Sequence, residues 1–239
     1  MSEYLDSALG MGYGTALTPL LILIGYNPLT IIPAILVSQL ATDIAACVFH
    51  HNLRNVDLRF RSPDLKIALP LALSSSIGVA ISVLVALHIP KWFLTLYIGL
   101  LIISMGFIIL YTTNKTIRFS WSKIIGISFL ASFNKGISGG GYGPLLMGGQ
   151  ILSGVNAKNA VGITAFAEAI TCLVGFILYL VMGKTIDWKL TGFLVVSASI
   201  AVPVAAITVK TLPINRLRKY IGILITILGA LTLLKITSR

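Results

Sequence analysis

The chain has 239 residues, of which 56% are hydrophobic and only 10% are charged, and its mean hydropathy is +0.96. Soluble domains carry roughly 25% charged residues, so this chain has too few charges to cover a surface that faces water. A soluble protein is therefore excluded. The net charge of +11 is explained by basic loops on the cytoplasmic side of a membrane, and nucleic acid is not an expected partner.

The N-terminal stretch MSEYLDSALG is acidic, whereas a cleavable signal peptide begins with a basic region, so we expect none. Long apolar runs follow, and several reach the roughly 20 residues that a helix needs to cross a bilayer. They do not alternate as barrel strands do. We expect an all-α fold, a polytopic helical membrane protein of about eight membrane segments in the cell (plasma) membrane.

Two glycine clusters interrupt apolar runs, GMGYG at 10–14 and GGGYG at 139–143. Glycine is about 1 kcal/mol worse than alanine inside a helix, so we predict that a helix breaks at each cluster. Unpaired backbone groups cost several kcal/mol in lipid, and the unwound residues must therefore face protein, a ligand or a wet cavity. Only nine residues precede Gly10, which is short for a complete half-helix.

The clusters mark an internal repeat. An offset of 129 aligns GMGYG with GGGYG, and an offset of 123 aligns YIGLLIISMG (97–106) with YIGILITILG (220–229). We predict two homologous repeats, residues 1–114 and 115–239, which together form one transmembrane domain. The first segment of each repeat is expected to be broken at its glycine cluster.

The basic residues allow two topologies under the positive-inside rule. If every segment crosses the membrane, the two sides carry eleven and six Lys or Arg residues, and the repeats are parallel. If the glycine segments are re-entrant, the sides carry twelve and five, and the repeats are inverted. These counts do not separate the two topologies, so both stay open.

Matched broken segments in two halves are the best sequence indicator of a transporter's binding site. Backbone N–H groups and the positive end of the following half-helix suit a small anion. We predict that an anionic substrate binds between the two breaks. The predicted substrate-binding residues are Gly10, Gly12, Tyr13, Gly14, Asn134, Lys135, Ser138, Gly139, Gly140, Gly141, Tyr142 and Gly143.

Two charged residues lie at membrane depth, where charge is costly and usually functional. Lys135 can attract the anion, pair with a carboxylate such as its repeat counterpart Asp6, or extend to an interface. Glu168 can carry a proton for coupling, contact the substrate, or serve as a structural acid that faces Lys135. The predicted coupling or cavity-lining residues are Glu168, Gln39, Thr42, Thr171, Asp43 and Asp6, although both threonines can instead bond their own i−4 carbonyls.

Metal or cofactor chemistry is not expected. The adjacent His50 and His51 cannot share one helical face, and they are expected at a solvated loop end or in a gate. Cys47 and Cys172 lack a metal-type spacing and are predicted to be small buried hydrophobes. We therefore predict no cofactor and no metal site.

Two other classes of protein remain as alternatives. GMGYG is similar to the TVGYG filter of potassium channels, but such a filter needs four copies around an axis. An intramembrane enzyme would need a nucleophile and a base, for which Ser138 and Lys135 are the nearest candidates, but G-x-S-x-G and H-E-x-x-H are absent. The chain also lacks a P-loop motif, so transport would be driven by a gradient or simply facilitated.

Four stretches, at 6–42, 50–57, 133–154 and 160–171, resemble the TauE/SafE family, also called the sulfite exporter or TSUP family. The resemblance rests on a glycine-rich break near the start of each half, followed by a proline and a helix of small residues. It implies a secondary transporter or facilitator, an exporter, of small sulfur-containing anions such as sulfite, thiosulfate or organosulfonates. The implied partners are the substrate, the lipid bilayer and, in a homo-oligomer, further copies of the chain.

This sequence departs from the family pattern at two positions. Met11 stands where the second half has Gly140, so we expect the anion to prefer the second break. Gln39 stands where close relatives often carry Glu, which would reduce a carboxylate pair to Glu168 alone.

Overall fold

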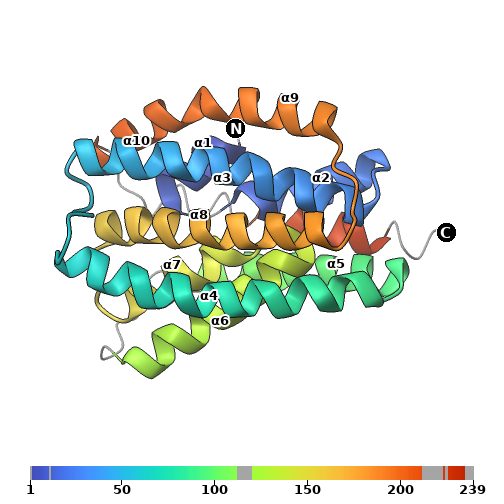
Figure 1. Cartoon of the computed structure of the whole chain (residues 1–239), viewed down its shortest axis with the longest axis horizontal. Coiled ribbons are helices and arrows are strands. Elements are labelled where there is room, and N and C mark those ends of the chain that lie inside the picture. Colours follow the sequence, from blue (N-terminus) through green and yellow to red (C-terminus); the bar gives the residue numbers. More distant parts are fainter. Residues whose placement is uncertain (1, 11, 112–119, 212–222, 224–225, 235–239) are drawn as a thin grey trace.

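The computed structural model describes residues 2–10, 12–111, 120–211, 223 and 226–234, and all regular secondary structure in these ranges is helical (Figure 1). Residues 226–234 form a helical stretch, and the ten labelled helices are α1 (Ser2–Leu9), α2 (Tyr13–Ile24), α3 (Pro28–Asn52), α4 (Pro63–His88), α5 (Lys91–Tyr111), α6 (Trp121–Ser138), α7 (Tyr142–Leu152), α8 (Ala157–Val181), α9 (Trp188–Ser199) and α10 (Ala201–Thr211).

Five stretches of the described residues are long and apolar enough to cross a membrane. They are Pro28–Asn52, Pro63–His88, Lys91–Ile108, Ala157–Val181 and Trp188–Ile207. This finding confirms a helical, multi-pass membrane protein. The predicted arrangement of eight segments goes further than these five spans, and the stretch 220–229 lies partly outside the described residues.

The same turn connects α2 to α3 and α7 to α8. Gly25 and Gly154 have positive φ angles of 114° and 86°, which glycine adopts more readily than other residues. Asn27 and Asn156 then cap the next helices, because each side chain accepts a backbone N–H bond from two residues ahead, at 3.1 and 3.0 Å. Helices α3 and α8 each contain 25 residues and begin 129 residues apart.

Helices α3 and α8 lie side by side and run in opposite directions (Figure 1). Leu36 packs against Gly175, Gln39 bonds with Glu168, and Ala46 and Ala165 belong to one buried cluster. Along this interface the residue numbers of α8 decrease where those of α3 increase, so the two helices are antiparallel. Helix α4 packs against α8 and α6, and α9 packs against α3, so these two central helices are covered by their neighbours.

The outward face of α4 is apolar. Five large hydrophobic side chains on this helix are exposed at a spacing of three or four residues, Leu69, Leu73, Ile77, Ile81 and Leu84. This spacing places them on one side of the helix, and a continuous apolar stripe of this kind suits contact with lipid rather than with water.

Helices α4 and α6 approach each other closely at Gly78. A Cβ atom at this position would overlap Ser132 Oγ and crowd the backbone carbonyl of Phe129. The absence of a side chain at Gly78 therefore sets the spacing between the two helices.

We expect Gly78→Ala to lower the free energy of unfolding by about 1–3 kcal/mol, the usual cost of overpacking a well-packed interior. Gly126→Ala is the matched control, because a Cβ on Gly126 of α6 would meet no atom within 4 Å. Thermal unfolding of the purified protein in detergent measures both effects. Equal melting temperatures for the two variants would contradict close packing of α4 against α6.

Candidate functional site

Two helix interruptions coincide with the glycine clusters. Helix α1 ends at Leu9 and α2 begins at Tyr13, while α6 ends at Ser138 and α7 begins at Tyr142. The linking residues Gly10, Gly12, Gly139 and Gly141 have φ angles of 63°, 137°, 73° and 79°. L-residues with a side chain rarely adopt these angles, so the sequence of each cluster explains the local backbone.

The two clusters contact each other directly, although they come from opposite halves of the chain. A Cβ atom on Gly14 would overlap the carbonyl oxygen of Gly139, and a Cβ on Gly140 would lie 2.6 Å from the backbone carbon of Gly14. Helices α2 and α7 therefore begin close to one backbone-to-backbone contact. Met11, the residue expected to distinguish the two breaks, lies outside the described residues.

The backbone N–H groups of the second cluster already have partners. The N–H of Gly139 donates to the Lys135 carbonyl (2.7 Å), that of Gly140 to Ser138 Oγ (3.1 Å), and that of Gly141 to Thr15 Oγ1 (3.0 Å). An anion could replace the last two acceptors only after the hydroxyl groups of Ser138 and Thr15 moved away.

Tyr13, Tyr142 and Asn134, which were predicted to bind substrate, connect helices in this structure. The Tyr13 hydroxyl bonds with Ser38 Oγ (2.6 Å) and the Tyr142 hydroxyl with Ser75 Oγ (2.9 Å). Asn134 Oδ1 accepts a bond of 2.5 Å from the Tyr97 hydroxyl, and Gly143 is buried in α7. The Ser138 hydroxyl donates to the backbone carbonyls of Asn134 and Gly140. Lys135 has different partners, so the candidate nucleophile and the candidate base are each bonded elsewhere.

Lys135 forms a buried ion pair. Its Nζ lies 2.7 Å from Glu168 Oε1, and the two side chains are 1% and 4% exposed. The ammonium group also donates to Gln39 Oε1. The carboxylate partner is therefore Glu168 rather than the repeat counterpart Asp6, and Lys135 does not extend to an interface.

Gln39 connects this pair to Asp6. Its Nε2 atom donates to Asp6 Oδ2 and to Glu168 Oε1, both at 2.9 Å. One hydrogen-bonded network thus joins α1, α3, α6 and α8. At an offset of 129, Asp6 is the counterpart of Lys135 and Gln39 that of Glu168, so the network consists of two counterpart pairs.

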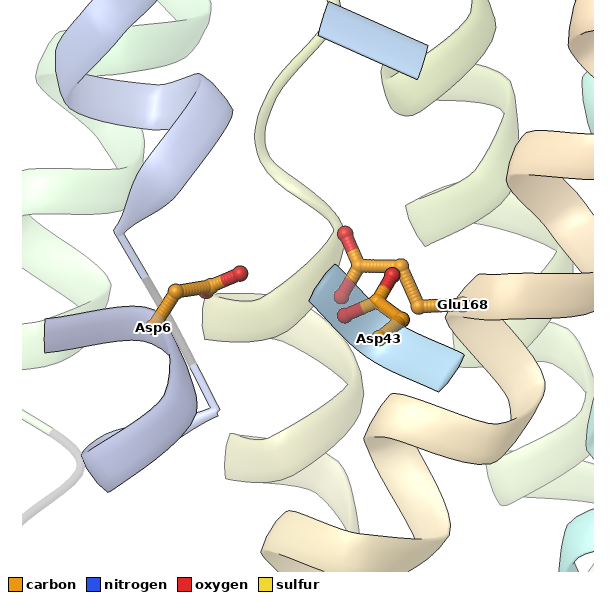
Figure 2. Close-up of side chains that lie close together, drawn as sticks. All are labelled: Asp6, Asp43 and Glu168. Carbon is orange, nitrogen blue, oxygen red and sulfur yellow. The ribbon is translucent and has the colours of Figure 1, made fainter. Parts of the chain in front are cut away.

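Asp43 brings a third carboxylate to this network, one helical turn beyond Gln39. One oxygen from each of Asp6, Asp43 and Glu168 lies within 4.8 Å of the other two. Figure 2 shows Asp6 directed from α1 toward Asp43 and Glu168, which lie close together. Asp43 is 5% exposed, and its Oδ2 has no hydrogen-bond partner in the part of the chain that the structure describes.

Glu3 is a fourth buried carboxylate, which the sequence analysis missed. It accepts hydrogen bonds from the hydroxyls of Ser7 (2.6 Å) and Thr42 (3.2 Å). Thr42 therefore contacts this cluster, and its hydroxyl also bonds the Ser38 carbonyl one turn back (3.3 Å), as the Thr171 hydroxyl bonds the Ala167 carbonyl (2.7 Å). Four of the seven acidic residues in the sequence thus gather around Lys135. The i, i+3 spacing of Glu3 and Asp6 was the signal that could have revealed Glu3.

His50 is also buried, so the expectation of a solvated loop end was wrong for this residue. Its Nε2 bonds with the Ser7 carbonyl at 3.0 Å, and its Nδ1 bonds with Asn55. The equivalent contact in the second half joins the Tyr179 hydroxyl to the Gly136 carbonyl at 2.9 Å. Both residues of this second contact stand 129 positions after those of the first, so the two halves make the same contact with different side chains.

The carboxylates border a small cavity. Its lining includes Asp6, Asp43, Glu168, Gly10, His50 and Thr164. The cavity has room for about one water molecule, so a sulfur oxyanion does not fit into it without movement of the helices.

The sequence model of the family described as "Sulfite exporter TauE/SafE" matches residues 2–232. The chain belongs to the TauE/SafE family. It is also 25% identical over 243 residues to a protein of Bacillus subtilis (strain 168) described as "Probable membrane transporter protein YtnM", across 98% of this chain and 80% of that relative. No solved structure matches the chain. Together, these similarities and the apolar helices identify a membrane transporter of the TauE/SafE family.

We expect Lys135→Met to lower the free energy of unfolding by about 3–5 kcal/mol, because it leaves Glu168 buried without its charge partner. The double variant Lys135→Met/Glu168→Gln should recover part of this loss. Lys158→Met is the control, since Lys158 is exposed at the start of α8. Chemical unfolding in detergent measures all three, and equal stability of Lys135→Met and Lys158→Met would refute the importance of the pair.

Proposed function

We propose that this TauE/SafE protein is a secondary transporter or facilitator that exports small sulfur-containing anions such as sulfite, thiosulfate or organosulfonates. The observation that carries the proposal is the backbone contact between the two glycine clusters, close to which helices α2 and α7 begin. Helix N-termini favour anions through their free N–H groups and their dipole. The description of the family as a sulfite exporter supports the substrate class.

We infer that residues 1–114 and 115–239 are inverted repeats, with eight segments of which the first in each half is re-entrant. The opposite directions of α3 and α8 support inversion, because parallel repeats would orient these counterparts the same way. The equivalent hydrogen bonds of His50 and Tyr179 also support it. In such transporters the substrate site lies at the repeat interface near the middle of the membrane.

In this proposal the anion binds between the clusters when one repeat rocks against the other. Ser138 and Thr15 then release the N–H groups of Gly140 and Gly141, and the anion takes their place as acceptor. Among the described side chains, Lys135 is the buried cation nearest to this anion position. Its ammonium group can favour an anion only if the surrounding carboxylates are neutralised at the same time, so substrate binding and charge neutralisation are coupled.

Flux measurements in proteoliposomes test the proposed function. Vesicles that contain the purified protein should release sulfite, thiosulfate or methanesulfonate faster than protein-free vesicles, with chloride and phosphate as comparison anions. Rates equal to those of protein-free vesicles for all three sulfur anions would contradict the proposed substrate class.

The contribution of the second glycine cluster can be measured separately. Because the anion must displace the Ser138 hydroxyl from the Gly140 N–H, Ser138→Ala should strengthen the apparent affinity for the transported anion, by up to about tenfold, the net worth of one hydrogen bond. Ser197→Ala is the matched control, because Ser197 is exposed on α9. The same half-saturation concentration in both variants would remove Ser138 from the binding site.

A further inference from the structure

The buried network has an excess of negative groups. Glu3, Asp6, Asp43 and Glu168 are all at most 6% exposed, and Lys135 is the one buried Lys or Arg among the side chains that the structure describes. Buried carboxylates are stable only when they are paired, hydrogen-bonded or bound to a cation. One ammonium group cannot neutralise four carboxylates, so this region requires additional positive charge, from a metal cation or from protons.

Asp43 shows where that charge is needed. Lys135 and Gln39 donate to Glu168, Gln39 donates to Asp6, and Ser7 and Thr42 donate to Glu3. Asp43 Oδ2 is buried and has no hydrogen-bond partner among the described residues. Since Asp43 also lines the cavity beside Asp6 and Glu168, the unpaired oxygen marks an incomplete site rather than a completed structural network.

The donor set and the space available identify the type of cation. Three carboxylate oxygens within 4.8 Å of one another can converge on one ion at the roughly 2.4 Å distances typical of hard cations. Hard cations prefer such oxygen ligands. Mg²⁺ usually keeps several waters, and a cavity with room for about one water cannot hold them, so a small ion that loses most of its water fits best.

The backbone beside the cavity suits the same ion. The C-terminal end of α1 borders the cavity through Ser7 and Gly10, and the dipole of a helix places partial negative charge at this end. In transporters with broken helices, half-helix C-termini and unwound carbonyls commonly coordinate the coupling cation.

We propose that Asp6, Asp43 and Glu168 form a binding site for one Na⁺ ion that is coupled to substrate movement. The coupling, though not the binding, rests on the proposed transport function. Binding of Na⁺ supplies the positive charge that an anion at Lys135 requires. Because both sites must be filled together, Na⁺ and the anion cross the membrane in the same direction.

The other titratable groups around Asp43 are few. Glu3 lies on α1, Cys47 and His50 on α3, Lys135 on α6 and Cys172 on α8. Lys135 is the permanent positive charge among them, so protons are the competing way to neutralise the carboxylates, and the experiment must separate sodium from pH.

Thermal unfolding of the purified full chain in NaCl, compared with choline chloride at equal ionic strength and at several pH values, tests the site. Na⁺ should raise the melting temperature by mass action, and Asp43→Asn should weaken the apparent Na⁺ affinity about tenfold or more. Asp57→Asn is the matched control, because its side chain is 52% exposed. Asp6→Asn serves as a second variant if Asp43→Asn does not fold.

The outcomes separate this proposal from the proposed function. Stability that responds to pH but not to Na⁺, or an unchanged Na⁺ response in Asp43→Asn, would overturn the sodium site. In proteoliposomes, flux of a sulfur anion that is independent of the Na⁺ gradient would overturn the coupling and leave the proposed function intact. Na⁺ binding without flux of any sulfur anion would support the site and contradict the proposed function.

Discussion

The buried ion pair between Lys135 and Glu168 is the interaction on which the centre of this protein depends. A charge inside a membrane protein must have a partner, because neither lipid nor a packed interior can solvate it. Lys135 reaches Glu168 from α6, and Gln39 extends the contact to Asp6 on α1. Four helices from both halves of the chain are thereby held at one point, next to the contact between the glycine clusters.

Two neighbouring regions of this arrangement favour charges of opposite sign. The helix starts at the glycine clusters favour negative charge, whereas the carboxylates around Lys135 favour positive charge. In the proposed mechanism, an anion and a cation that bind near each other satisfy both requirements, and each makes the other's binding more favourable. The small cavity, with room for about one water, and the internally bonded N–H groups indicate that helices must move before an anion enters. Movement of one half against the other is the natural candidate, and it would have to shift the packing of α3 on α8 and of α4 on α6.

Contacts at positions 129 residues apart keep the same partners' positions although the side chains differ. His50 and Tyr179 differ in chemistry, yet each bonds to a backbone carbonyl at the corresponding position. Gln39 and Glu168 differ in charge, yet they bond to each other. Positions 129 residues apart therefore bring different charges to one place, and the site is asymmetric.

The sequence by itself determined the membrane class through its composition and the family through its glycine-rich motifs. It also predicted a helix break at each glycine cluster from local backbone preference. It further predicted a functional role for five polar residues, because a polar side chain within an apolar run is costly unless it has a partner or a function. These residues are Lys135, Glu168, Gln39, Asp43 and Asp6. It did not determine which of them would meet, and it missed Glu3 and the buried environment of His50. Only the tertiary structure decided that Lys135 pairs with Glu168 rather than Asp6, and that three carboxylates from distant positions share one cavity. These contacts depend on how α1, α3, α6 and α8 pack in three dimensions, which no local pattern in the chain encodes.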